Sequence, residues 1–314
     1  TTPGRNTRVH ESCCLVVLRS TLSICFCCQT DVMVDFICAE AGLCNKLRSV
    51  LSYREAAAQR GRRLVVLWRL GAACDSPFED LFEPLPGVVM LHGLGELPPA
   101  HREALAAAGG VAKASVYDSH PSIKYTETEA TMYAALSPLP PVRAAASANV
   151  AACGGAFVAV HMRRTDHTAM FGDRTPDEAF FTFLAERAPL PIFCATDNAL
   201  TLREVGRRFP LRLRGAAPIP ELAGGEAEGE AEGEARHTSV ERAAVDLLTC
   251  VEATAFMGTY MSSFSDAIAL LRRARGLDTS DDRHVVRSLG GKHYDPDVHS
   301  VALPPLGPPA GEPG

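Results

Sequence analysis

The sequence lacks the excess of positive charge that proteins built to hold nucleic acid carry. Its formal net charge at pH 7 is -6, and its isoelectric point lies near 5.9. Lysine is almost absent, whereas arginine is plentiful. This charge balance argues against a protein whose main task is to bind nucleic-acid phosphate. Any site for an anion must therefore be local.

The cysteines lack the repeated spacing that zinc sites have. Five of the eleven lie within residues 13–28, and the others are scattered singly along the chain. Cys38, Cys194 and Cys250 each stand inside an apolar run. We therefore expect these three to be buried thiols rather than members of disulfides.

A long uninterrupted hydrophobic run is also missing. Residues 13–28 are apolar but are interrupted by Arg19, so the stretch is too short for a membrane span. The sequence does not begin with methionine. We expect residues 1–30 to be a truncated signal anchor or an unstructured segment, and membrane attachment only if such an anchor has been lost.

The chain does contain an alternation of short apolar strands with amphipathic helices. Strands are predicted at residues 31–38, 63–68, 87–91, 156–162, 191–196 and 254–259, with helical patterns between them. Strand, helix, strand order is typical of parallel sheets, and a proline-rich break at 137–142 divides the pattern into two halves. The prediction is an α/β protein with two Rossmann-like domains facing a cleft, at residues 31–145 and 146–290. An acidic low-complexity insert is predicted at 222–236 and a flexible tail at 291–314.

Ligands of open α/β sheets bind beyond the carboxyl ends of the strands, so we searched those points for polar residues. An apolar strand ends at His161 and is followed by Arg163, Arg164 and Asp166. Guanidinium groups match phosphate oxygens with paired donors, so this loop favours a pyrophosphate ligand. Two other interpretations are an arginine-aspartate ion pair that ties the loop down and a metal site made by His161, Asp166 and His167.

Two further loops carry weaker signals. Gly42 would let the backbone approach a ligand, and Asn45 stands where a helix cap would be, although the pair could equally be an ordinary strand-to-helix turn. Asp197 ends another buried strand, and its alternative role is a cap for the next helix.

The last signals lie in the final two predicted helices. Asp246 is embedded in an apolar helix face, so it needs a partner, which could be the N1 and N2 edge of guanine or Arg242 one turn earlier. Ser262 and Ser263 open the last helix, and a helix N-terminus with two hydroxyls favours an anion.

Taken together, the segments GLCNKLR, FVAVHMRRTD, PIFCATDN, AAVDLL and GTYMSSFS resemble the fucosyltransferase superfamily, which includes α1,6-fucosyltransferases, nodulation fucosyltransferases and protein O-fucosyltransferases. The resemblance covers residues 31–275, and HMRRTD is its specific part. It implies a GT-B fold, GDP-fucose as donor and transfer with inversion. It also implies that no metal or other cofactor is needed.

The resemblance assigns roles to individual residues. Arg163 matches the arginine at the donor β-phosphate and is the catalytic group expected here. Asp173 is the carboxylate nearest to the place where α1,6 enzymes hold a glutamate, and it is the second predicted catalytic residue. The other predicted donor-binding residues are His161 and Asp246 near the guanine, Arg164 and Asp166 in the arginine loop, Asp197, Ser262 and Ser263 beside the pyrophosphate, and Gly42 and Asn45.

Two positions depart from the family pattern. His167 stands where the α1,6 enzymes often have lysine, and Asn198 replaces the second aspartate of the ATDD segment. The linkage and the acceptor therefore stay open, since acceptor loops vary on a shared scaffold.

The sequence thus predicts a glycosyltransferase that moves fucose from GDP-fucose to a glycan or protein acceptor. The alternatives are a non-catalytic protein that binds GDP-sugar or carbohydrate on the same scaffold, and a structural α/β protein whose arginines form only ion pairs. The resemblance implies the Golgi or secretory pathway for a eukaryotic member and the cytoplasm otherwise.

Overall fold

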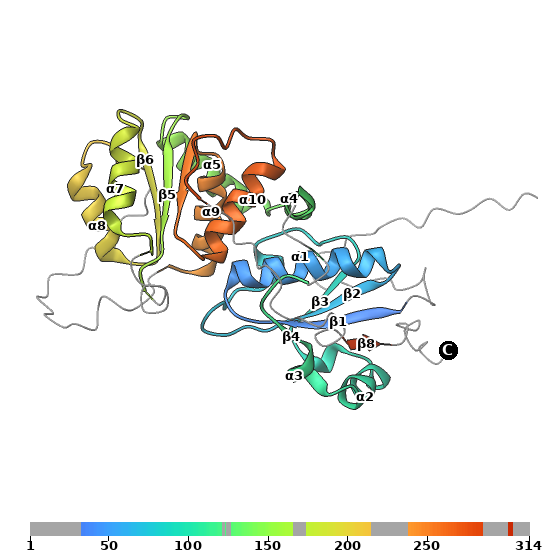
Figure 1. Ribbon diagram of the computed structural model, residues 1–314. Coiled ribbons are helices and arrows are strands. Elements are labelled where there is room, and N and C mark those ends of the chain that lie inside the picture. Colours follow the sequence, from blue (N-terminus) through green and yellow to red (C-terminus); the bar gives the residue numbers. More distant parts are fainter. Residues whose placement is uncertain are drawn as a thin grey trace, which may run out of the picture.

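Two parallel sheets, each covered by helices, organise the chain (Figure 1). The computed structural model describes residues 33–120, 123, 127–165, 174–214, 238–284 and 301–303. We call the part built on the sheet nearest the N-terminus the first lobe and the part built on the other sheet the second lobe. The predicted α/β class with two Rossmann-like units is confirmed.

The first sheet has the strand order β3-β2-β1-β4, and all of these neighbours are parallel. Every residue of its central strand β1 is buried, as expected for a parallel strand covered on both faces. The strands are β1 (Val34–Ala39), β2 (Arg63–Trp68), β3 (Val88–Leu91) and β4 (Ser115–Val116).

The helices of the first lobe lie on the two faces of this sheet. Helix α1 (Leu43–Gln59) covers one face, and α2 (Pro99–Ala107) and α3 (Gly110–Ala114) lie on the other (Figure 1). Two short 3-10 turns, at Phe78–Asp80 and Leu94–Glu96, interrupt the connections. Helix α4 (Glu127–Tyr133) lies between the lobes, where it packs against both α1 and α10 (Ser263–Ala274).

The second sheet has the order β6-β5-β7, again fully parallel. Its strands are β5 (Val158–Met162), β6 (Ile192–Thr196) and β7 (Ala255–Gly258). Figure 1 shows α7 (Asp177–Glu186) and α8 (Ala199–Arg208) on one face, with α5 (Pro140–Ala152), α9 (Val240–Val251) and α10 on the other. The carboxyl ends of all three strands consequently meet at one edge.

A single buried apolar cluster extends through both lobes. It includes Leu47 and Leu51 of α1, Met132 of α4, and Ile268 and Leu271 of α10. Apolar burial is the main favourable term in folding, so this continuity holds the lobes together as well as each lobe by itself.

The chain returns to the first lobe at its end. Val301–Leu303 form a short strand, β8, which pairs antiparallel with Val34–Phe36 of β1. These residues lie inside the segment predicted to be a flexible tail, so that expectation was wrong for them. The physical reason is that β4 covers only the last part of β1, leaving backbone donors and acceptors that β8 satisfies.

Two other sequence expectations can be compared with the structure. Cys38, Cys194 and Cys250 are buried free thiols, as predicted, and burial raises the pKa of both Cys38 and Cys194 to about 12. Residues 1–30 and the acidic insert at 222–236 lie outside the described residues. Among the helices that the structure describes, none is long and apolar enough to span a bilayer.

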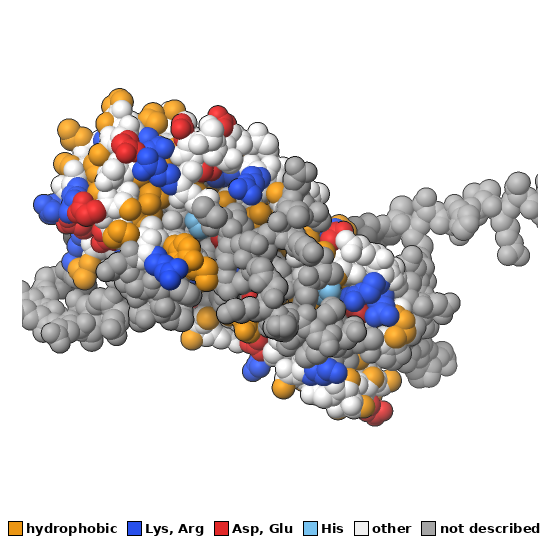
Figure 2. All heavy atoms as spheres, viewed as in Figure 1, with side chains coloured by type: hydrophobic (Ala, Val, Ile, Leu, Met, Phe, Trp, Pro, Cys, Tyr) orange, Lys and Arg blue, Asp and Glu red, His pale blue; other side chains and the backbone are white. Residues whose placement is uncertain are grey.

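Charges of both signs mix on the surface. Figure 2 shows Lys and Arg side chains beside Asp and Glu side chains on the visible face of the second lobe. Ion pairs account for part of this mixing, such as Arg208 of α8 with Glu178 of α7 at 2.8 Å. Exposed pairs of this kind add little to stability.

Candidate functional site

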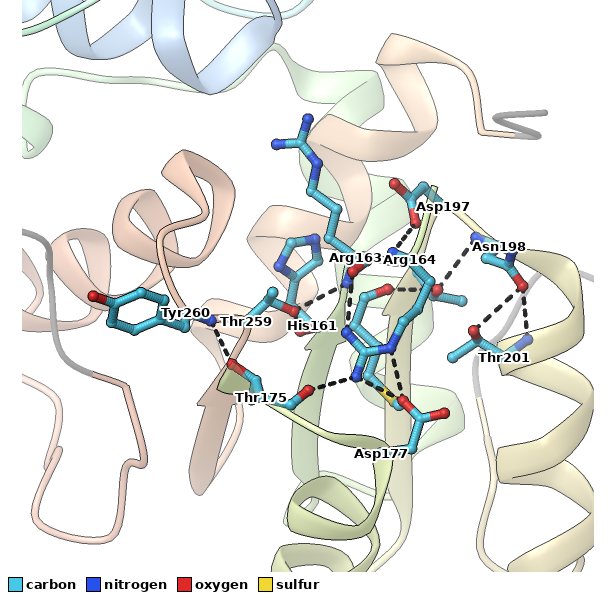
Figure 3. Close-up of polar contacts among 12 residues, drawn as sticks. His161, Arg163, Arg164, Thr175, Asp177, Asp197, Asn198, Thr201, Thr259 and Tyr260 are labelled. Atoms are coloured by element: carbon cyan, nitrogen blue, oxygen red, sulfur yellow. Dashed lines mark hydrogen bonds and ion pairs between the residues drawn. The ribbon is translucent and has the colours of Figure 1, made fainter. Parts of the chain in front are cut away.

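The residues that directly follow the three strands of the second sheet form one polar group (Figure 3). Arg163 follows β5, Asp197 follows β6 and Thr259 follows β7. Parallel strands bring their carboxyl ends to the same edge, so three residues far apart in sequence become neighbours. This edge is where the sequence predicted a site.

Thr259 and Ser265 fix the geometry of His161 and Arg163. The Thr259 hydroxyl donates to the His161 carbonyl at 2.7 Å and accepts from the Arg163 backbone N–H at 3.0 Å. The Ser265 hydroxyl accepts from the Thr259 N–H at 3.0 Å and lies 2.7 Å from His161 Nδ1. The His161 ring also packs on Phe264, with ring centroids 4.5 Å apart. The imidazole is buried and held from two sides.

Arg164 is committed to the loop itself. Its Nε and Nη2 lie 2.7 and 2.6 Å from one carboxylate oxygen of Asp177, and Nη2 also donates to the Thr175 carbonyl at 2.9 Å. Its guanidinium lies over the ring of Phe180 at 5.3 Å. Arg164 therefore orders the loop in this structure, with Asp177 as its partner.

Asp197 links the ends of two strands. Its carboxylate accepts from the Arg164 N–H at 2.9 Å and from the Thr165 hydroxyl at 2.6 Å. The cap of the following helix is Asn198, whose Oδ1 accepts from the Thr201 N–H at 2.9 Å. The alternative role of Asp197 as that cap is therefore wrong, and the carboxylate instead orders the arginine loop.

The two adjacent arginines point in different directions. Figure 3 shows the Arg163 side chain extending away from the contacts that hold Arg164 to Asp177. Successive side chains leave an extended backbone on opposite sides, so fixing one arginine in the loop directs the other away from it. Arg163 is thus the arginine whose charge is directed out of the loop.

The N-terminus of α10 borders the same group of residues. Ser262 is its N-cap and Ser263 its first residue, as the sequence predicted. The Ser262 hydroxyl is fully buried, makes no cap bond, and has no hydrogen-bond partner among the described residues. A helix N-terminus carries partial positive charge and unpaired N–H groups, which favour an anion.

Gly258 allows α10 to approach the end of β7. A Cβ atom added there would lie 2.6 Å from both Ser265 Cβ and His284 Nδ1. Such distances do not occur between real side chains, so only glycine fits between the strand and the helix. This close approach brings the Ser265 hydroxyl within reach of His161 and Thr259.

Asp246 forms an ion pair in this structure. Its Oδ1 lies 2.8 Å from Arg242 Nε, which is the partner that one of the two sequence interpretations named. The side chain is buried on α9, and burial raises its pKa to about 7, an effect that Arg242 only partly offsets. A carboxylate with that pKa changes its charge near neutral pH.

The first-lobe residues differ from expectation. Helix α1 begins at Leu43 with Gly42 as N-cap, so Asn45 lies inside the helix and does not cap it. Its Oδ1 instead accepts from Arg48 Nη2 at 2.9 Å. Gly42 has ordinary backbone angles, and an added Cβ would meet only the Ala73 carbonyl at 3.6 Å, so its described neighbours do not require glycine.

Three residues of the sequence prediction, Asp166, His167 and Asp173, lie outside the described residues. Within the part of the chain that the structure covers, no group of three or more His, Cys, Asp or Glu side chains is arranged to hold a metal ion.

Comparisons with solved structures identify the fold. Neither a family model nor a curated protein sequence matches the chain. Among solved structures, NodZ α-1,6-fucosyltransferase co-crystallized with GDP matches with a TM-score of 0.52, 20% sequence identity, and coverage of 77% of this chain and 93% of that chain. POFUT1 in its apo form matches with a TM-score of 0.52, 14% identity, and coverage of 80% and 98%.

The chain has the GT-B fold of these fucosyltransferases. Fucosyltransferase NodZ from Bradyrhizobium gives the same result, with a TM-score of 0.50, 19% identity, and coverage of 77% of this chain and 94% of that chain. The coverage includes both sheets, so the GT-B likeness is a property of the whole fold and not of one lobe. At these identities the likeness extends to the fold, and activity has to be argued from the site.

Three residues of the candidate site were not predicted from the sequence, namely Thr259, Ser265 and Asp177. Thr259 directly follows β7, as Arg163 directly follows β5, so the strand-end rule that found the arginines applies to it equally. Ser265 and Asp177 act through bonds to residues distant in sequence, and no local pattern indicates such bonds.

Proposed function

We propose that the chain is a glycosyltransferase that transfers fucose from GDP-fucose to a glycan or protein acceptor, with inversion at the anomeric carbon and without a metal. The fold supports a glycosyltransferase. NodZ crystals with the same fold were soaked with GDP-fucose or co-crystallized with GDP, which supports a GDP-sugar as donor.

The arrangement of Arg163 carries the proposal. Its backbone is held by Thr259, its neighbour Arg164 is tied to Asp177, and its own side chain is directed away from that pair (Figure 3). The N-terminus of α10 borders the same network through Ser265. A pyrophosphate bound between them would receive a permanent positive charge from one side and helix N–H groups from the other.

The chemistry requires this kind of charge. When the bond between the anomeric carbon and the phosphate oxygen breaks, both electrons leave with GDP and the sugar carbon becomes oxocarbenium-like. Arg163 and the first turn of α10 would stabilise the negative charge on GDP. The acceptor hydroxyl then bonds to the carbon from the opposite face and gives its proton to a base, for which Asp173 is the residue we propose.

Guanine recognition is proposed for His161 and Asp246. An ionised Asp246 can accept two parallel hydrogen bonds from N1 and N2 of guanine, which adenine does not offer. Arg242 favours the charged form of the carboxylate, and burial opposes that form more strongly. His161 is fixed by Ser265 and stacked on Phe264, so its ring has a single orientation toward a ligand.

A second candidate function is a GDP-sugar-binding protein without catalysis. The observation in its favour is that Asp197 and Asp246 are both engaged, the first by Arg164 and Thr165 and the second by Arg242. Neither is therefore suited to accept the acceptor proton. Tight binding of GDP with no release of GDP from GDP-fucose would favour this candidate.

Calorimetric titration with GDP tests the proposal, with GMP, ADP and UDP as comparison ligands and EDTA present throughout. We expect micromolar binding of GDP, weaker binding of the others, and loss of GDP binding in Arg163→Ala. Arg203→Ala is the matched control, because Arg203 is exposed on α8 of the same lobe. A folded protein that binds no nucleotide would refute both candidate functions.

A further inference from the structure

A buried ionic cluster lies between the two lobes. Arg48 Nη1 on α1 is 4.0 Å from Asp266 Oδ2 in the first turns of α10, and these side chains are only 6% and 2% exposed. Arg48 belongs to the first lobe and Asp266 to the second. Burying a carboxylate is costly unless an opposite charge and hydrogen bonds compensate it. Part of the compensation of Asp266 therefore comes from across the lobe interface.

The first lobe holds the Arg48 guanidinium in place. Nη2 lies 2.9 Å from Asn45 Oδ1, 3.2 Å from the Tyr117 carbonyl and 3.0 Å from Asp118 Oδ1. The Ser49 hydroxyl donates to the Asp118 carbonyl at 3.0 Å, which fixes this segment to α1. Arg48 thus lies near two carboxylates, Asp118 of the first lobe and Asp266 of the second.

The second lobe connects Asp266 to the candidate site. Its backbone N–H donates to the carbonyl of the N-cap Ser262 at 3.0 Å, and its Oδ1 lies 2.9 Å from His284 Nε2. The preceding residue, Ser265, contacts His161. The Asp266 carboxylate therefore belongs to the same helix terminus that would receive the phosphates.

A negative charge at this position has two opposing effects. It is favourable toward the partial positive charge of the helix N-terminus, and it repels any anion that binds there. A neighbouring positive charge removes the repulsion and leaves the N–H groups available to the ligand. Arg48 has the charge, the burial and the fixed geometry for that role.

We propose that Arg48 is a positioning residue for donor binding: it neutralises Asp266 so that the N-terminus of α10 can accept the pyrophosphate. This inference rests on the proposed function and adds that the first lobe contributes charge to the donor site. It also gives Asn45 a role, since Asn45 accepts a hydrogen bond from Arg48.

The test is calorimetry on the full chain with GDP, inorganic pyrophosphate and guanosine as probes. We expect Arg48→Met to weaken binding of GDP and pyrophosphate about tenfold or more, the effect of losing one positive charge near an anion. Guanosine binding should change less than twofold, because guanosine is neutral. Arg48→Lys should retain most of the affinity for GDP. Arg54→Met is the control on the same helix, since Arg54 Nε donates to the Pro86 carbonyl at 2.9 Å.

The double variant separates charge from structure. In Arg48→Met with Asp266→Asn the positive and the negative charge are removed together, and we expect GDP affinity to return to within about threefold of the wild type. This variant also stands in for Arg48→Met if the single change prevents folding. A tenfold loss that persists in the folded double variant would overturn the inference.

The outcomes also distinguish this inference from the proposed function. Wild-type binding of GDP with equal binding by Arg48→Met overturns the inference alone. Wild-type binding of pyrophosphate without selectivity for GDP, lost in Arg48→Met, supports the inference and contradicts guanine recognition. A wild-type protein that binds neither probe refutes both.

Discussion

The two lobes have the same kind of parallel sheet but differ at the edge where the strands end. In the second lobe the side chains at this edge bond to one another, as His161, Ser265 and Thr259 do. In the first lobe the edge exposes apolar side chains, with Leu70 after β2 48% exposed and Tyr117 after β4 54% exposed. The first-lobe edge has polar contacts too, such as Arg69 with Glu40 at 3.3 Å, but these two side chains are 57% and 32% exposed, whereas His161, Ser265 and Thr259 are buried.

This difference separates two kinds of recognition. A network whose members fix one another has one geometry, which suits a ligand of constant chemistry such as a nucleotide. Exposed side chains at strand ends can be replaced without loss of the fold, which suits a ligand that varies between related proteins. In the proposed function these ligands are the donor and the acceptor.

The largest expected effect comes from Arg163 in the ordered edge. Arg163→Ala should lower the release of GDP from GDP-fucose on the order of a hundredfold or more, because removing one donor to a developing charge costs roughly 3 to 4 kcal/mol. Arg164→Ala should mainly lower the melting temperature, since Arg164 is bonded to Asp177 and Thr175.

Initial rates and thermal melts of both variants, with Arg203→Ala as control, separate these effects. Near-normal turnover in Arg163→Ala would show that the arginine directed out of the loop is not the catalytic one. An equal loss of rate in both variants, with equal loss of stability, would mean that the two arginines act only through the loop.

Gly258→Ala tests how tightly the ordered edge is packed. The new Cβ would lie 2.6 Å from Ser265 Cβ and His284 Nδ1, so we expect destabilisation of roughly 1 to 3 kcal/mol by overpacking. Gly71→Ala in the first lobe is the matched control, because an added Cβ there meets nothing within 4 Å. Urea unfolding measures both, and equal destabilisation would contradict the difference in packing between the lobes.

Asp246 tests the charge state of the guanine site. Burial raises the pKa of Asp246 in the folded state to about 7 from its ordinary value of 3.8, so the folded chain keeps a proton that the unfolded chain loses. The free energy of unfolding of the wild type should fall as pH rises between these values, and that of Asp246→Asn should not. GDP binding, which needs the carboxylate, should strengthen about fivefold between pH 6 and 7 in the wild type, because the ionised fraction of a group with a pKa of about 7 rises from roughly one tenth to one half.

Asp246→Asn provides the control for the binding measurement as well. Protonation of the GDP phosphates is common to both proteins, so the difference between their pH profiles isolates the carboxylate. The titratable groups that interact with Asp246 are Arg242, Cys194 and Cys250. Burial raises the pKa of both cysteines above their ordinary values, so neither changes its charge between pH 6 and 7. Identical pH profiles would exclude Asp246 as the guanine-binding group.

The sequence predicted the elements well because each depends on local pattern. The strands and helices of both sheets follow from apolar periodicity, and the serines that open α10 follow from capping preference. Asn45 was misplaced because the N-cap of α1 is Gly42, three residues before the polar side chain that was expected to cap it. Strand β8 was missed because its pairing depends on a gap left by β4, which no local pattern records.

The site contacts that the sequence did not predict join residues that are distant along the chain. The sequence left two possible partners for Asp246, and the structure shows the ion pair with Arg242. Ser265 contacts His161 and Asp266 contacts Arg48 across more than a hundred residues. Such pairs arise from the packing of α10 between the lobes, so strand-end rules point to the edge of the sheet but not to the bonds within it.

The smallest expected effect is in the exposed edge, at Leu70. Leu70→Ser should change the free energy of unfolding by no more than about 0.5 kcal/mol, since the side chain is half exposed, and it should leave the affinity for GDP unchanged. Calorimetry with GDP and urea unfolding check both points. A Leu70→Ser protein that loses GDP binding would show that the donor site also includes the strand-end edge of the first lobe, where Leu70 lies. In that case the donor and the acceptor would not bind to separate lobes. An unchanged affinity for GDP would limit the first lobe's contribution to donor binding to the interface between α1 and α10.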